Sequence, residues 1–116
     1  MIPSRIKRVE ELVKEQVALI IQRDVKDPRL DFVTVSSIHV AKDLRNADIY
    51  VTTFDETQEH IREIMEALKS ATGFIRRLLG ERIVLRYLPA LKFHYDASFK
   101  QANRIDEILH QIENEK

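Results

Sequence analysis

The chain lacks several features that would assign it to a particular class of protein. It contains no cysteine, which excludes a disulfide framework and a thiolate metal site and agrees with a reducing compartment. Its longest apolar run has five residues, 17–21, against the roughly 18 that a membrane-spanning helix needs. The N-terminus shows no secretory signal pattern, so we expect a cytoplasmic protein. What is present, 44% hydrophobic and 33% charged residues among 116, indicates one globular domain.

Net charge is also absent, because 19 cations balance 19 anions. That balance by itself argues against a nucleic-acid partner, since phosphate binding is driven by lysine and arginine. The distribution of charge is uneven, however. Residues 61–92 hold seven cations against three anions, whereas residues 41–60 hold two against five. The chain is therefore polarised, and an anionic partner is expected to meet the segment 61–92.

Hydrophobic periodicity predicts the elements of the first half. Apolar residues recur at spacings of three and four up to about residue 23, after an N-cap at Ser4, and indicate an amphipathic helix. Residues 32–40 are rich in β-branched side chains, and residues 47–52 alternate between apolar and polar. We expect these two segments to pair as antiparallel strands across a polar turn.

The second half predicts a long helix, a third strand and a closing helix. Apolar residues at helical spacing run from about residue 57 to Gly80, which is interpreted as the glycine that follows a helix end. A strand is expected over 82–87, with an extension over 91–95, and a closing helix over about 98–114. Helices on one face of a three-stranded sheet make an α+β two-layer sandwich, with residues 1–116 as a single domain.

Gly73 is the most informative position of the long helix. Glycine costs about 1 kcal/mol against alanine in a helix interior, so a packing or binding reason is expected. On a helical wheel it opens toward a group of polar residues, which are Lys69, Ser70, Arg76 and Arg77. An exposed backbone beside these cations would let a phosphate come close. If the helix instead breaks near residues 71–73, the freed N–H groups would also bind an anion.

Two plainer interpretations of the same residues stay open. Gly73 can serve only to let another helix pack closely, and the arginines can serve only to solvate a face. Further cations at three other places are candidates for phosphate contact. Arg82 and Arg86 follow the long helix, and Lys26 and Arg29 lie beside a proline turn. Arg5, Lys7 and Arg8 lie at the start of the first helix, where cations are unfavourable to the helix dipole.

Residues with catalytic chemistry are not arranged in a recognisable way. The histidines, His39, His60, His94 and His110, fall in different predicted elements and lack metal-ligand spacing. Two aspartate pairs, Asp24 with Asp27 and Asp43 with Asp48, lie in polar turns where carboxylates are usual. No glycine-rich phosphate loop or nucleophile elbow is present. We therefore expect no enzyme activity, metal or cofactor.

Short motifs in the same order along nearly the whole chain carry a family resemblance. They are Arg8-Val9, Asp27-Pro28-Arg29-Leu30, Val33-Thr34-Val35, Asp43-Leu44, Ala47-x-x-Tyr50-Val51, Ala71-x-Gly73-Phe74-Ile75-Arg76 and Leu85-Arg86-x-x-Pro89-x-Leu91-x-Phe93-x-x-Asp96. With these motifs the sequence resembles the ribosome-binding factor A family of bacterial small-subunit assembly factors.

The resemblance implies a type II KH-like fold, in which Ala71-Thr72-Gly73 forms a kink between two helices in place of the usual GxxG loop. It also implies binding to 16S rRNA in the late-maturing 30S subunit, near the 5′-end helix and the decoding region. Support of 16S rRNA processing, especially in the cold, would follow. We expect a monomeric, non-catalytic RNA-binding factor. The rival hypothesis is a protein-binding adaptor that uses a sheet edge around residues 82–95, with the cations as solubility groups.

Overall fold

The computed structural model of the chain describes residues 4–97 and contains two long helices and three strands. The elements follow one another as α1 (Arg5–Arg23), the 3-10 turn η1 (Pro28–Leu30), β1 (Thr34–Val40), β2 (Asn46–Thr52), α2 (Gln58–Arg82) and β3 (Ala90–Tyr95). The closing helix expected over 98–114 lies outside the described residues. No helix within residues 4–97 is both long and apolar enough to cross a membrane.

The sheet has the order β1-β2-β3, with β2 in the centre. β1 pairs with β2 antiparallel, so that Val35 lies opposite Val51. This confirms the predicted hairpin. β3 pairs with β2 parallel and places Phe93 opposite Ile49. A parallel neighbour requires the chain to cross from one end of the sheet to the other, and α2 makes that crossing.

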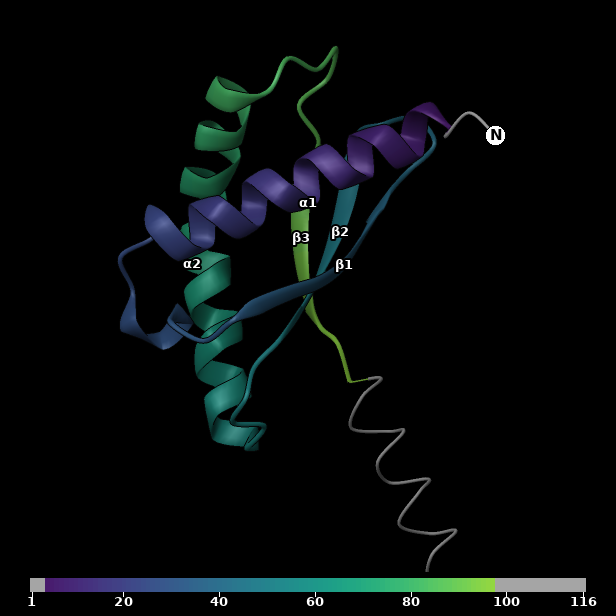
Figure 1. Cartoon of the computed structure of the whole chain (residues 1–116). Helices are drawn as coiled ribbons and strands as arrows, with labels where there is room; N and C mark the ends of the chain where they lie inside the picture. The colour runs from purple at the N-terminus through teal and green to yellow at the C-terminus, as the bar shows by residue number, and fades with distance from the viewer. Residues whose placement is uncertain (1–3, 98–116) are drawn as a thin grey trace, which may run out of the picture.

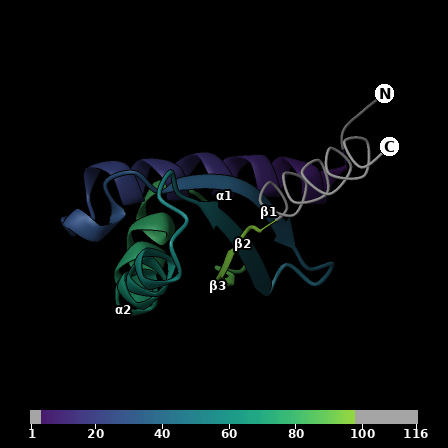
Figure 2. The same ribbon diagram turned by 90° about the horizontal axis from the view of Figure 1, so that it is seen from below.

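Both helices pack on one face of the sheet (Figures 1 and 2). Alternate residues of β2 are buried on that face, and each helix supplies one apolar stripe to the same core. The fully buried members are Ile49 and Val51 from β2, Val13, Val17 and Ile20 from α1, and Ile64, Leu68, Ile75 and Leu79 from α2. The α+β two-layer fold predicted from the sequence is confirmed.

α1 is fixed at its start and along the edge of β1. Ser4 caps the helix, because its side-chain oxygen accepts a 3.2 Å hydrogen bond from the Lys7 N–H group. Further along, Glu10 accepts a hydrogen bond of 2.9 Å from the Val40 N–H group, and Lys14 donates one of 3.3 Å to the Ser36 carbonyl oxygen. These side chains occupy backbone groups of the edge strand that would otherwise be open to another chain.

The expected helix end at Gly80 is wrong. α2 continues through Gly80 to Arg82, and a Cβ atom on Gly80 would lie 3.0 Å from the Leu88 side chain. The glycine therefore permits close approach of Leu88, and a packing contact of this kind has no local sequence signal. The strand expected over 82–87 is wrong as well, because β3 contains only Ala90–Tyr95, close to the extension predicted over 91–95.

A break of the long helix near residues 71–73, one of the two geometries considered for this segment, does not occur. Residues 71–73 lie inside α2, which is a single helix of 25 residues. Thr72 keeps its side chain within the helix by donating a 2.7 Å hydrogen bond to the Leu68 carbonyl oxygen, a local contact that tends to bend helices. Because the helix is continuous, its backbone N–H groups near Gly73 are not freed to hold an anion.

Candidate nucleic-acid interface

One face of α2 carries an exposed strip that we call the α2 strip, consisting of Lys69, Ser70, Gly73, Arg76 and Arg77. All five residues are exposed. The opposite face of the helix holds the buried core residues, while Ala71 and Thr72 lie between the two faces and are half-buried. The structure therefore gathers the cations that the sequence placed around Gly73 on one exposed surface.

The space over Gly73 is open. A Cβ atom built on this residue would meet nothing within 4 Å, apart from the backbone of its own helix turns. The interpretation that Gly73 lets another helix pack closely is therefore wrong within the described part of the chain. What the glycine leaves is a bare stretch of helix beside Lys69 and Arg77, where a ligand backbone can approach.

The two arginines of the α2 strip have different surroundings. Arg76 donates hydrogen bonds to two carbonyl oxygens of the loop before β3, from Nη2 to Leu88 at 2.8 Å and from Nε to Pro89 at 3.0 Å. Arg77 forms no ion pair with a carboxylate of residues 4–97, and its guanidinium lies 5.5 Å from the Phe74 ring centroid. Arg76 thus positions a loop, and Arg77 presents its charge outward.

A second cationic cluster lies around Tyr87, and we call Arg5, Arg45, Arg86 and Tyr87 the Tyr87 corner. The guanidinium carbon of Arg45 lies 4.8 Å from the centroid of the tyrosine ring, and that of Arg86 lies 5.4 Å from it. Arg5, from the first turn of α1, joins Arg86 and Tyr87 in lining a small cavity of about 180 Å³. Two separate segments of the chain thus bring guanidinium groups to one aromatic ring, and a third, through Arg5, lines the cavity beside it.

No sequence pattern singled out Arg45 or Tyr87. Arg45 lies in a polar turn where a charged residue is ordinary, and Tyr87 belonged to a segment that was expected to be a strand. Their proximity depends on α2 crossing the sheet, which no spacing along the chain reveals. An aromatic residue next to Arg86 was the only local signal.

Two of the other selected arginines have their charge matched by a carboxylate. Arg82 forms a 2.7 Å ion pair with Asp24 at the end of α1. Arg29 forms a forked pair with Asp27, at 2.7 Å from Nη2 and 3.0 Å from Nε. The hydrogen bonds from Arg29 lower the pKa of Asp27, and those same hydrogen bonds raise the pKa of Arg29. Because their charge is offset by a carboxylate, Arg82 and Arg29 contribute less to a phosphate-binding surface than unpaired arginines would.

The remaining selected cations are exposed at two sites of the fold. Lys7 and Arg8 project from the first turn of α1, close in sequence to Arg5 of the Tyr87 corner. Lys26 lies in the turn after α1, beside η1, which packs against α2. Acidic side chains of α2, Glu63 and Glu66, act on the charge of Arg29 in that region. The turn after α1 is therefore a less cationic surface than the start of α1.

Each histidine of the described residues lies near a carboxylate. Asp48 lies 2.7 Å from Nε2 of His94, and the His94 ring stacks on Tyr50 with centroids 5.0 Å apart. His39 and His60 each lie near a glutamate. Residues 4–97 contain no group of three or more metal-ligating side chains of the kind that would hold an ion.

Comparison with known proteins adds the family. A family model described as ribosome-binding factor A matches residues 5–109. A ribosome-binding factor A of Halothermothrix orenii is 41% identical over 113 residues, which cover 97% of this chain and 92% of the relative. That of Hahella chejuensis is 43% identical over 111 residues, covering 91% and 82%.

Solved structures agree with the sequence matches. The crystal structure of ribosome-binding factor A from Thermus thermophilus superposes with a TM-score of 0.69 at 29% identity, covering 79% of this chain and 97% of that one. A homology model of the Thermus thermophilus protein, fitted into a cryo-EM map of its complex with the 30S subunit, gives 0.65 at 30% identity, covering 78% and 93%. The resemblance found in the sequence is thus confirmed, and the chain belongs to the ribosome-binding factor A family.

Proposed function

We propose that this chain is a non-catalytic assembly factor that binds the small ribosomal subunit by contacting 16S rRNA. The relative fitted into a map of a 30S complex supports a ribosomal partner. The observation that carries the RNA contact is the open space over Gly73, where nothing lies within 4 Å of a Cβ position, beside the exposed cations Lys69 and Arg77. A phosphate backbone needs both close approach and positive charge, and this surface offers both.

The two cationic clusters are proposed to hold the RNA together. Arg76 connects them, because it belongs to the α2 strip and holds the loop that carries Arg86 and Tyr87. An aromatic ring accompanies each cluster: Phe74, beside Arg77 of the α2 strip, is 39% exposed, and Tyr87 of the Tyr87 corner is 40% exposed. Unpaired bases stack on such rings, whereas phosphates meet the guanidinium groups. This arrangement favours structured RNA with unstacked nucleotides over the edges of paired bases.

The biological role follows the resemblance. We infer that the protein acts as a monomer in the cytoplasm, holds an rRNA conformation during late 30S maturation, and assists 16S rRNA 5′-end processing, most importantly at low temperature. Holding RNA requires no catalytic group.

The test is co-sedimentation of the protein with 30S and 70S particles across a potassium chloride series, followed by RNA footprinting. We expect binding to 30S that weakens with salt. The double variant Lys69→Ala with Arg77→Ala should lower the affinity at least about tenfold and reduce the salt slope by about 2. The matched control removes two exposed cations outside both clusters, Arg23→Ala with Lys92→Ala, and should change the affinity less.

Unchanged 30S association of the folded Lys69/Arg77 double variant would remove the α2 strip from the interface. Binding that is insensitive to salt, with no protection of rRNA, would favour the adaptor hypothesis instead. Sedimentation velocity of the isolated protein tests the monomeric state.

A further inference from the structure

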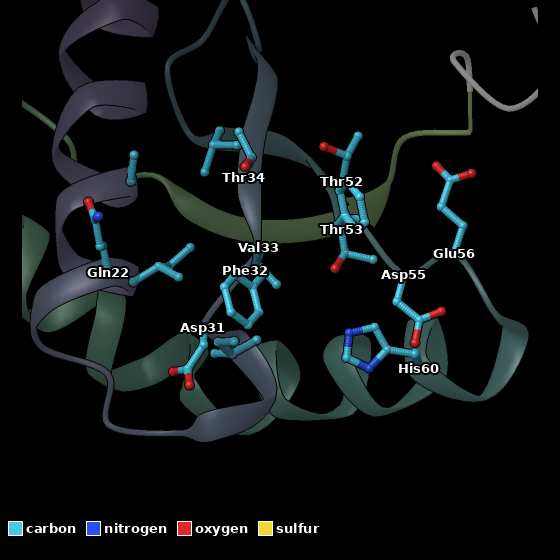
Figure 3. A pocket seen from close by; sticks show the side chains of 15 residues that line it. Gln22, Asp31, Phe32, Val33, Thr34, Thr52, Thr53, Asp55, Glu56 and His60 are labelled. Atoms are coloured by element: carbon cyan, nitrogen blue, oxygen red, sulfur yellow. The ribbon is translucent and has the colours of Figure 1, made fainter.

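A large open groove lies at the end of the sheet away from the Tyr87 corner. It has a volume of about 1160 Å³ and is bounded by the segments before β1 and after β2 and by the first turn of α2 (Figure 3). None of the cations proposed to meet RNA lines it. The groove is therefore a separate surface, and the RNA contacts proposed above leave it unused.

The groove combines an apolar floor with two exposed aromatic rings. Buried aliphatic side chains form the floor, including Ile21, Leu30 and Val35. Phe32 is 76% exposed and Phe54 is 97% exposed, although both are large apolar residues. Exposed aromatic rings beside an apolar floor are typical of a surface that buries an apolar group of a partner.

Carboxylates dominate the charge of the groove. Asp31, Asp55 and Glu56 line it, and the lining contains no lysine or arginine. No cation of residues 4–97 forms an ion pair with these three carboxylates. Phosphates would be repelled here, so the surface excludes RNA and complements a partner that carries positive charge.

Thr53 adds an unused polar group. The residue is only 7% exposed, and its side-chain oxygen is buried without a hydrogen-bond partner among the described residues. In Figure 3 that oxygen points into the space between Phe32 and His60. A buried hydroxyl without a partner is costly, so an apolar group of the same size at this position should not destabilise the wall of the groove.

We propose that the groove docks a segment of a basic partner protein, one that packs a bulky apolar side chain on the apolar floor beside Phe32 and Phe54 and places lysine or arginine beside the acidic rim. The apolar floor accounts for the side chain, and the three carboxylates account for the charge. This segment would sit in the groove while the α2 strip holds RNA, as the proposed function has it.

The test uses the full chain, labelled for NMR, and a synthetic six-residue peptide with leucine and phenylalanine between two pairs of lysines. We expect saturable shifts confined to amides around residues 31–35 and 52–60. Phe54→Ala should weaken the binding at least about tenfold. Leu12→Ala is the matched control, since Leu12 is an exposed apolar residue of α1 outside the groove, and it should leave the affinity unchanged.

Charge is tested separately. The double variant Asp31→Asn with Asp55→Asn should weaken binding of the lysine peptide several-fold, while Glu81→Gln, an exposed acid far along α2, should not. A peptide with glutamates in place of the lysines should not bind. Equal binding of the two peptides, or no saturable shift, would overturn the proposal.

Two other occupants are distinguished in the same experiment. Groove signals that move with protein concentration alone would assign the surface to a second copy of this chain. Groove signals that move on Ile108→Asp substitution without any peptide would assign it to the chain's own C-terminal segment. Either result would overturn docking of a partner protein.

Discussion

The Nε–H group of Arg76 donates a hydrogen bond of 3.0 Å to the carbonyl oxygen of Pro89, a fully buried residue directly before β3. An exposed cation of α2 thus fixes the loop that returns the chain to the sheet. A second bond, from Nη2 to the Leu88 carbonyl oxygen at 2.8 Å, holds the same loop. Arg76 therefore has a structural task that its neighbour Arg77 does not share.

Substitution of Arg76 by alanine should lower the free energy of unfolding by about 1–3 kcal/mol, because two carbonyl oxygens lose a charged donor. Arg77→Ala should change it by no more than about 0.5 kcal/mol, since Arg77 lies on an exposed face. Urea denaturation followed by circular dichroism measures both values. Arg76→Lys should restore little of the loss, because lysine lacks the forked geometry. Wild-type stability of Arg76→Ala would show that these bonds do not hold the loop.

Substitution of Gly73 by alanine separates stability from binding. The added methyl group meets nothing within 4 Å, so the variant should gain about 1 kcal/mol from helix propensity alone. If RNA approaches the bare helix there, 30S affinity should fall although the protein is more stable. Thermal denaturation and co-sedimentation with 30S particles give the two readouts.

Gly80→Ala is the matched comparison for the same propensity gain. Its Cβ atom would lie 3.0 Å from the end of the Leu88 side chain, which must shift to make room. We expect a smaller stability gain than at Gly73 and unchanged 30S affinity. Equal affinity of Gly73→Ala and the wild type would show that RNA does not use the space over Gly73.

Local signals explain which parts of the fold the sequence predicted. Ser4 is a capping residue followed by apolar residues at helical spacing, and the hairpin has alternation on both sides of a polar turn, so both were found. The prediction of a helix end at Gly80 was wrong because glycine occurs both after helix ends and where another side chain packs closely. A helix end and a close contact look the same along the chain, and only the fold shows that Leu88 lies over this position.

The sequence predicted which segment carries the cations of the candidate site, but not which partners each arginine has in the fold. Lys69 and Arg77 were found because they share a helix face, which spacing gives directly. Arg82 meets Asp24 across 58 positions of the chain, and Arg45 meets Tyr87 through a loop whose course was not predicted. Tertiary contacts decide which cations are paired with a carboxylate and which remain available to RNA. The sequence could therefore rank segments by their charge, but it could not rank single arginines by their availability.

Thr53 offers a stability test of the groove. Its buried hydroxyl has no hydrogen-bond partner in the described structure, so Thr53→Val should raise the free energy of unfolding by about 1 kcal/mol. Thr57→Val is the matched control, because Thr57 caps α2 by accepting a hydrogen bond of 3.3 Å from the His60 N–H group. That variant should lose about 1 kcal/mol. Urea denaturation measures both, and a loss of stability in Thr53→Val would mean that the hydroxyl has a partner.

Tyr95 makes the free energy of unfolding depend on pH in the alkaline range. Burial and the hydrogen bond that it donates to Glu56 at 3.0 Å raise the pKa of Tyr95 from 10.0 to about 12. Between these two values the unfolded chain releases the phenol proton while the folded chain keeps it, so the unfolded state binds fewer protons. The contribution of this group is therefore complete below pH 10 and is lost as the pH rises toward 12.

Tyr95→Phe isolates this effect. The stability difference between wild type and variant should shrink by about 1–2 kcal/mol from about pH 9.5 to pH 12, because solvent around the partly exposed ring screens some of the interaction. Urea denaturation at each pH measures this difference. Glu56→Gln removes the carboxylate but leaves the burial, so the decline should still begin near pH 10 but should be smaller and end at a lower pH. A difference that stays constant across this range would contradict the raised pKa.

Arg86 and Arg82 lie close in sequence and should differ in RNA binding because only one of them is paired. Arg82 is 2.7 Å from the Asp24 carboxylate, whereas Arg86 faces Tyr87 and has no carboxylate partner among residues 4–97. Arg86→Ala should therefore reduce the slope of log affinity for 30S against log salt by about 1, and Arg82→Ala by less. If Arg82 acts only within its ion pair, removing both Arg82 and Asp24 should restore wild-type binding. In a double-mutant cycle on the free energy of unfolding, the two residues should couple by about 0.5 kcal/mol. Equal slopes for Arg86→Ala and Arg82→Ala would show that the ion pair opens when RNA binds, and would place Arg82 in the interface with the Tyr87 corner.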